Sequence, residues 1–187
     1  MIGRFSVISA ITLLFVTACS EGCGGDVAVP RREAYPRIQL PAPVWRSDTI
    51  GTVAVMVNLA AKSQCDSNGW LTVDYPYGLA RLYLTLTPFG GIDADQAVAN
   101  RLERLSMNTG GAVTTVDEFD NRLGRRCMLM VSLSGCPTPV QFIAVAPGEW
   151  MLSGSALVEK AASAPGDSLR PVIDMLKRDI IHLLDEL

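Results

Sequence analysis

The chain has 187 residues, of which 49% are hydrophobic, and its 16 basic and 19 acidic side chains give a net charge of −3. This length is typical of one domain. Charges of both signs are scattered along the chain, whereas nucleic-acid-binding proteins gather their basic residues in patches. We therefore expect no nucleic-acid partner and no basic membrane-binding surface.

The first eighteen residues have the pattern of a secretory signal. Arg4 is their only charge, and the apolar stretch 5–18 is shorter than the roughly 20 residues that span a bilayer. The stretch ends in Val16-Thr17-Ala18-Cys19, which resembles the lipobox of bacterial lipoproteins. That resemblance implies cleavage before Cys19 and acylation of its thiol and amine, which would anchor the protein stably in a membrane. The alternative is an ordinary signal peptide with a cysteine near its end.

The residues after Cys19 predict a tether followed by one folded domain. Residues 20–45 contain four prolines with glycine and charges but no periodicity, and proline is excluded from helix interiors. We expect a signal peptide over residues 1–18, a lipidated N-terminus and tether over 19–45, and a single globular α+β domain over 46–187.

Most of the predicted domain consists of strands. In residues 80–89, Leu82, Leu84 and Leu86 alternate with polar or half-polar neighbours, which is the period of a strand with one wet face. Short turn sequences separate the predicted strands, which favours an antiparallel meander. The strands are expected at 52–59, 70–75, 80–89, 112–119, 127–133, 140–145 and 150–159.

Two helices complete the predicted fold. In residues 90–107, Asp93 stands at an N-cap with Gln96 three residues on, as in a capping box. In residues 165–187, Asp167 or Ser168 can cap a helix whose apolar stripe runs through Leu176. We expect an α+β fold in which an antiparallel sheet of about six or seven strands is packed by two helices, including the long C-terminal one.

The remaining cysteines predict a disulfide rather than a metal site. An oxidising compartment permits a bond of Cys65 with Cys127 or Cys136, and the alternative is isolated buried thiols. Zinc is not expected, because the chain has one histidine, His182, and no CxxC motif.

No motif for catalysis appears in the sequence. His182 lies on the polar flank of the last predicted helix, where a solvated side chain is expected. The acids in 116–121 are too few for a calcium loop, and an enzyme would need a cluster such as Asp74, Asp117 and Asp120. We expect no enzymatic activity, metal or cofactor. The aromatic residues that could line a groove, instead of packing in the core or at an edge, are Trp70, Tyr75 and Tyr83.

Several segments together resemble the GldD-type gliding-motility lipoproteins of Bacteroidetes. They are PRREAYPRIQLP at 30–41, WLTVDYP at 70–76, ARLYLTL at 80–86, TPVQF at 138–142, LSGSAL at 152–157 and PGDSLRPVIDMLKRDIIHLL at 165–184. The chain departs from that pattern where the family has a cysteine before the tryptophan, since Gly69 stands there. It also lacks the family's His-x-x-Lys-Ala segment after the first helix and its Thr-Asp-Ser after the Gln-Phe strand, so the chain is identified as a divergent member.

The resemblance implies a function without a known chemical activity. It implies a non-enzymatic accessory lipoprotein of the gliding-motility and type IX secretion machinery, anchored by lipid at the periplasm-facing side of the outer membrane. Its partners would be other envelope proteins of that machinery. The predicted sheet and closing helix are also similar to Mog1/PsbP-like binding modules, by analogy of fold alone. The alternative is a cell-envelope lipoprotein that binds a small ligand or peptide and has no role in secretion.

Overall fold

The computed structural model describes residues 39–66, 68–109, 115–132, 136–159 and 166–187, without the side chains of 108, 109 and 166–168. The predicted caps Asp167 and Ser168 therefore lie outside the described side chains. Within these residues the elements follow one another as nine strands, two α-helices and one 3-10 turn. They are β1 (Trp45–Ile50), β2 (Val53–Asn58), β3 (Lys62–Asp66), β4 (Trp70–Asp74), η1 (Pro76–Gly78), β5 (Arg81–Pro88), α2 (Ala94–Thr109), β6 (Thr115–Asp120), β7 (Arg126–Val131), β8 (Val140–Ala146), β9 (Trp150–Leu157) and α3 (Gly166–Asp185).

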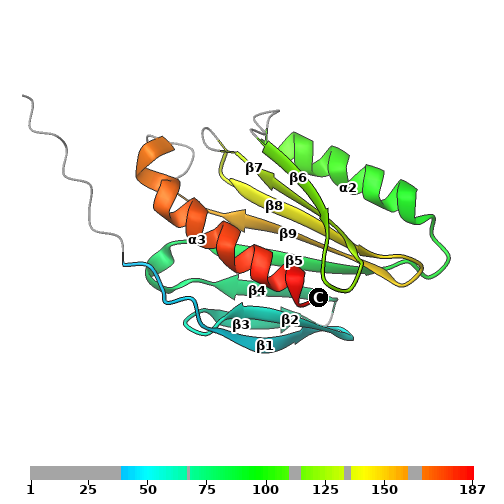
Figure 1. Ribbon diagram of the computed structural model, residues 1–187, viewed down its shortest axis with the longest axis horizontal. Coiled ribbons are helices and arrows are strands. Elements are labelled where there is room, and N and C mark those ends of the chain that lie inside the picture. The colour runs from blue at the N-terminus through cyan, green and yellow to red at the C-terminus, as the bar shows by residue number, and fades with distance from the viewer. Residues whose placement is uncertain (1–38, 67, 110–114, 133–135, 160–165) are drawn as a thin grey trace, which may run out of the picture. The chain divides into compact units, whose positions relative to one another are not determined.

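Seven of these strands form one antiparallel sheet in the order β3-β4-β5-β9-β8-β7-β6, and β1 pairs with β2 in a second, smaller sheet (Figure 1). The predicted α+β fold, with an antiparallel sheet of about six or seven strands packed by two helices, is thus confirmed. One detail differs, because the predicted strand 52–59 becomes β2 and belongs to the small sheet.

Two strands, β1 and β3, were not predicted. Their sequences, WRSDTI and KSQCD, contain no run of alternating apolar residues. β1 begins at Trp45, inside the segment expected to be a tether, and the carbonyl of Ala42 already accepts a hydrogen bond from Asn58 Nδ2 at 3.1 Å. β3 buries none of its own side chains and β1 fully buries one, Ile50, so both strands depend largely on pairing with an apolar neighbour.

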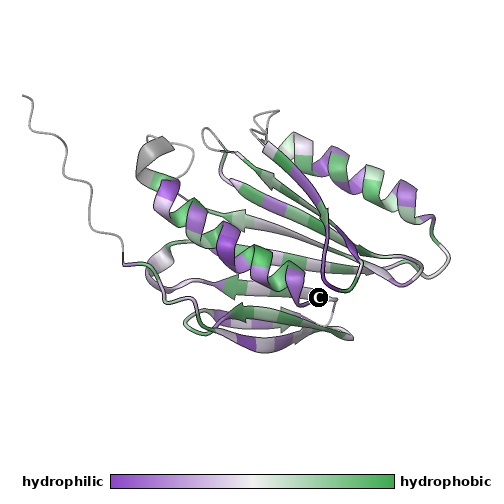
Figure 2. Ribbon diagram, in the orientation of Figure 1, coloured by the Kyte–Doolittle hydropathy of each residue, from purple (hydrophilic) through white to green (hydrophobic). Residues whose placement is uncertain are grey.

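The main core lies between α3 and one face of the large sheet. Phe142 and Ala144 of β8 alternate onto this face and pack with Leu176 and Ile180 of α3. The small sheet covers the same face beside α3, contributing Val55 and other side chains of β2. In Figure 2 hydrophilic and hydrophobic residues alternate in bands along α3, as in a helix with one apolar stripe.

At the centre of this core, two side chains lie directly against the backbone of Gly154. Gly154 of β9 lies opposite both Phe142 of β8 and Leu84 of β5. A Cβ atom at Gly154 would overlap the Phe142 ring and would lie 2.9 Å from Leu84 Cδ2. Glycine is therefore required at this position by packing.

The opposite face of the large sheet is covered only in part. Leu105 of α2 packs with Met130 of β7, Ile143 of β8 and Met151 of β9. The described helix that covers this face, α2, thus lies over β7, β8 and β9. The same face of β3, β4 and β5 carries polar and aromatic side chains instead.

Asp93 begins α2 as predicted, because its Oδ1 accepts a hydrogen bond from the backbone N–H of Asp95 at 3.1 Å. The second half of the predicted capping box does not form. Gln96 Nε2 donates instead to Asn100 Oδ1 at 2.9 Å, along the helix surface.

The end of α3 is held by the turn between β6 and β7. Asn121, which is 6% exposed, donates from Nδ2 to the carbonyls of Leu184 at 2.8 Å and Leu187 at 3.1 Å. Its Oδ1 accepts from the N–H groups of Leu123 and Arg125. One side chain therefore satisfies the last carbonyls of the helix and shapes the turn.

Candidate functional site

The predicted lipidation site, Cys19, lies outside the described residues. Cys65, Cys127 and Cys136 form no disulfide. Cys65 is on β3 and Cys127 is on β7, five strand spacings or roughly 24 Å apart in the sheet. A disulfide needs Cα atoms within about 7 Å. The predicted bond of Cys65 with Cys127 or Cys136 is therefore not formed in this structure.

The three aromatic residues of the predicted groove lie on different faces of the sheet. Tyr75 is 5% exposed and points into the main core, whereas Trp70 and Tyr83 are 57% and 41% exposed. Thr72 pairs with Tyr83, and Trp70 pairs with Thr85, so these four side chains share the face opposite α3. The structure therefore does not bring Trp70, Tyr75 and Tyr83 together on one surface.

Trp70, Thr72, Tyr83 and Thr85 instead form a surface that we call the open face. It lies on β4 and β5, beyond the strands that α2 covers. Arg81 at its far end is paired with Asp74 across the same two strands. Exposed tryptophan and tyrosine side chains are enriched in protein-protein contact surfaces.

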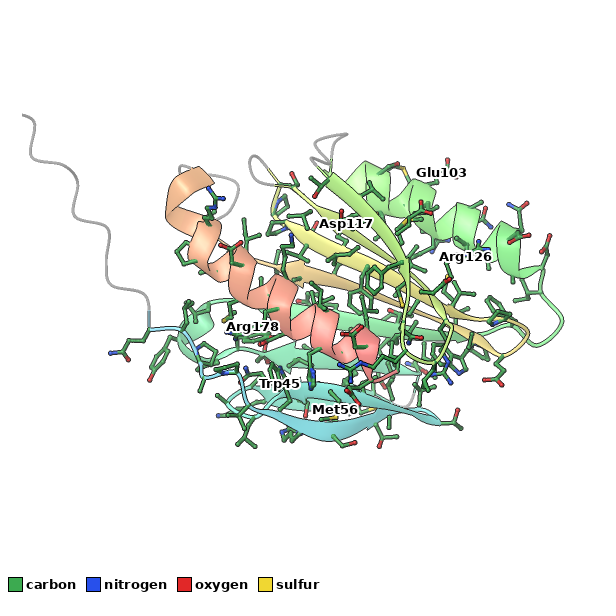
Figure 3. The ribbon with its side chains drawn as sticks, in the orientation of Figure 1. Trp45, Met56, Glu103, Asp117, Arg126 and Arg178 are labelled. Atoms are coloured by element: carbon green, nitrogen blue, oxygen red, sulfur yellow. The ribbon has the colours of Figure 1, made fainter. Side chains whose placement is uncertain are left out.

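The acids suggested for an enzyme are dispersed. Asp74 is on β4, and Asp117 and Asp120 are on β6, at the other edge of the sheet, five strand spacings or roughly 24 Å away. Figure 3 shows Asp117 on this edge, far from Trp45 on the small sheet. Residues 115–120 form a strand rather than a calcium loop. The catalytic cluster considered for these acids is therefore wrong, and in the described part of the chain no three His, Cys, Asp or Glu residues could hold a metal ion.

Among the described residues, the buried side chain with the most hydrogen bonds is Asp179 of α3, which is 4% exposed. Its Oδ2 accepts from Asn58 Nδ2 at 3.0 Å and from the Tyr75 hydroxyl at 3.1 Å. Its Oδ1 accepts from Trp45 Nε1 at 3.3 Å and from the Arg178 guanidinium at 3.1 Å. In Figure 3, Arg178 on α3 and Trp45 on β1 lie at this contact. One carboxylate thus joins α3 to the small sheet and to the end of β4.

The electrostatics of this cluster favour a fixed structural role. Burial raises the pKa of Tyr75 far above its usual range, and the neighbouring Asp179 charge raises it further, so the phenol stays a hydrogen-bond donor. His182, predicted to be solvated, packs against Trp45 instead, with ring centroids 3.9 Å apart. Donors surround Asp179 on all sides, which leaves no position for a substrate.

The structure has a cleft of about 590 Å³ between the small sheet and the turn ends of β7 and β9. Val53, Leu123 and Trp150 give it apolar walls, and Arg125 lies over the Trp150 ring at 4.9 Å. Glu149 and Glu186 are at its rim. The cleft is separate from Trp70 and Tyr83, where the sequence had suggested a groove.

A family model described as gliding motility lipoprotein GldD matches residues 25–187. The chain belongs to the GldD family of gliding-motility lipoproteins. No curated protein matches it. Among the described helices of this GldD-family protein, none is both long and apolar enough to cross a membrane. This family is not known for enzymes.

Two of the segments that resemble GldD-type lipoproteins meet in the structure. Tyr75 comes from WLTVDYP and Asp179 from the last helix, and they are hydrogen-bonded to each other. Neither Asp179 nor Asn58 stands out in the sequence. Asp179 stands on the flank of the apolar stripe, between Arg178 and Ile180, and only the position of the small sheet shows that it is buried.

Proposed function

We propose that this GldD-family protein is a non-enzymatic accessory component of the gliding-motility and type IX secretion machinery. It acts by binding other envelope proteins while Cys19 holds it by lipid at the periplasm-facing side of the outer membrane. The open face is the observation that supports binding, because Trp70 and Tyr83 are exposed side by side on a rigid sheet. The family supports the lipoprotein and the motility role.

The proposal is tested by deletion in the native host. Complementation with the wild-type chain should restore secretion of type IX cargo and colony spreading. The Cys19→Ala variant should remain as a poorly anchored precursor and should fail to restore either. Secretion and spreading that are unaffected by the deletion would contradict the proposed role, and membrane fractionation of Cys19→Ala identical to wild type would contradict lipidation.

The contact surface has its own test. Trp70→Ser and Tyr83→Ser together should leave the melting temperature nearly unchanged, because both side chains are exposed. The double variant should fail to complement the deletion. A matched control is Tyr77→Ser, which removes an 81% exposed aromatic ring away from the open face. Full complementation by the double variant would show that the open face is not the contact surface.

The cleft of about 590 Å³ supports a second proposal, in which the protein binds a small ligand or peptide unrelated to secretion. Its volume lies within the range of roughly 300 to 1,000 Å³ typical of ligand sites. Under this proposal Trp150→Ala would abolish thermal stabilisation by a ligand identified in a screen of envelope metabolites. Lack of stabilisation throughout such a screen, with a secretion defect in the deletion strain, would favour the first proposal.

A further inference from the structure

A second groove lies between α2 and strands β5 and β9, and it contains two arginines without a counter-ion. The groove has a volume of about 260 Å³. Arg101 and Arg104 of α2 both line it, and within the described residues neither takes part in an ion pair or a hydrogen bond. Arg101 is half-buried, and its Nε is inaccessible to water and has no hydrogen-bond partner. A buried donor without an acceptor is unfavourable.

The other lining residues are suited to an anion. The polar ones are Thr85 and Thr87 of β5, Ser153 of β9 and Asn100 of α2, each of which can donate a hydrogen bond. None of the lining residues is acidic. An arginine binds a carboxylate through two parallel hydrogen bonds. A carboxylate in the groove could therefore pair with the outer N–H groups of the Arg101 guanidinium, whose Nε is buried, and offset the repulsion between Arg101 and Arg104.

The size of the groove and its surroundings indicate a side chain of a protein rather than a free small molecule. The volume of about 260 Å³ lies below the usual range of sites for drug-sized ligands. Thr85 belongs both to the groove and to the open face, and it pairs with Trp70 on one side and Ser153 on the other. The groove is therefore continuous with the exposed aromatic rings.

We propose that this groove binds an aspartate or glutamate side chain of a partner protein. Arg101 and Arg104 hold the carboxylate, and residues next to it in the partner lie on Trp70 and Tyr83. This inference rests on the proposed function, since it names the chemistry of the partner for the open face. It predicts that the partner presents an exposed acidic segment.

Binding is measured on the full chain, purified from membranes in a nonionic detergent, by fluorescence anisotropy with a labelled hexaglutamate peptide. Hexaglutamine is the neutral control peptide. The variant R101Q/R104Q should bind hexaglutamate at least about tenfold more weakly than wild type, because each charged hydrogen bond contributes roughly that factor. R101K/R104K, which retains the charge without the planar fork, should lose less.

The matched control is R126Q/R170Q, which removes the same charge. Arg126 is exposed on β7 and Arg170 is exposed on α3, and neither lines the groove. The control should bind within about twofold of wild type. Equal loss in both double variants would mean general attraction of an anionic peptide to the surface and would overturn the proposal, as would unchanged binding by R101Q/R104Q.

Melting temperatures of all variants are compared first. R101Q/R104Q should melt at or above the wild-type temperature, because it removes a half-buried charge that has no partner. If R101Q/R104Q is unfolded, the single variants R101Q and R104Q are compared with wild type instead. Each should bind hexaglutamate about tenfold more weakly. Single variants that bind like wild type would overturn the proposal.

Complementation in the host separates this inference from the proposed function. If the deletion has no effect on secretion or spreading, the proposed function fails, and peptide binding alone decides whether the groove takes a carboxylate. If wild type restores both and R101Q/R104Q does not, the groove is the partner site. If R101Q/R104Q restores both fully, the partner-site proposal is overturned while the proposed function stands.

Discussion

Cys65 and Cys127 differ in reactivity because their surroundings differ. Cys65 is exposed on β3, whereas Cys127 is completely buried on β7. Burial raises the pKa of Cys127 to about 11, and the nearby carboxylates of Asp185 and Asp120 contribute to the rise. Since the thiolate is the reactive form, Cys127 stays protonated and unreactive at neutral and mildly alkaline pH.

Alkylation should distinguish the two cysteines. At pH 8, iodoacetamide should modify Cys65 within minutes and leave Cys127 unmodified until the protein is unfolded, as read by peptide mass spectrometry. Prior reduction should make no difference. If Cys65 became reactive only after a reductant was added, it would be disulfide-bonded, in disagreement with the structure.

Gly154 is required in the core because it has no side chain. Gly154→Ala would place a methyl group against the Phe142 ring in a fully buried position. We expect the free energy of unfolding to fall by about 2 to 3 kcal/mol, as measured in guanidinium chloride. The control, Ser155→Ala on the other face of β9, should change it by less than about 0.5 kcal/mol. Equal effects would show that the packing at Gly154 is looser than described.

At the scale of elements, α3 depends on its polar contact as well as on its apolar stripe. Asp179 receives donors from Trp45, Asn58 and Tyr75, which come from three different parts of the chain. Without the carboxylate, these three donors would have no acceptor in the cluster, and each buried donor left without one costs roughly 1 to 3 kcal/mol. The cluster therefore fixes how the helix and the small sheet are joined.

Asp179→Ala should lower the free energy of unfolding by about 3 kcal/mol or more. Asp174→Ala is a suitable comparison, because Asp174 is on the exposed side of the same helix. The free energy of unfolding of Asp174→Ala should lie within about 0.5 kcal/mol of the wild-type value. Urea denaturation followed by circular dichroism measures both. Coincident curves for the two variants would show that the cluster does not stabilise the domain.

The strands and helices also show which parts of the fold can be predicted from sequence patterns. Apolar alternation located β5, and the 3.6-residue stripe located α3, because these elements bury one face of their own. β1 and β3 escaped detection because pairing and cover from neighbours stabilise them. Likewise Arg101 and Arg104 are two charges on a helix in the sequence, and only the position of α2 over β9 shows that they share a groove.

At the scale of the whole molecule, the folded part extends further toward the N-terminus than the predicted boundary at residue 46. Trp45 donates to Asp179, and the carbonyl of Ala42 accepts from Asn58. Residues of the predicted tether therefore belong to the packed domain. The extent of the tether itself remains a proposal.

Truncation locates the boundary. A chain of residues 39–187 should melt within about 2 °C of the full protein, whereas residues 47–187 should lose about 2 kcal/mol or more of stability, because Asn58 and Asp179 lose partners. Differential scanning fluorimetry measures both. Equal melting temperatures for the two fragments would mean that contacts of Ala42 and Trp45 contribute little.

The Asp179 cluster also determines how late during synthesis the chain can complete its fold. Its donors Trp45, Asn58 and Tyr75 precede it by 134, 121 and 104 residues. Contacts over such sequence separations form late and slowly. The contacts that join the small sheet and Tyr75 to α3 therefore cannot form until α3 has been synthesised. A precursor that is exported as proposed would stay unfolded, and so able to thread through a translocation channel, until almost its whole length had passed.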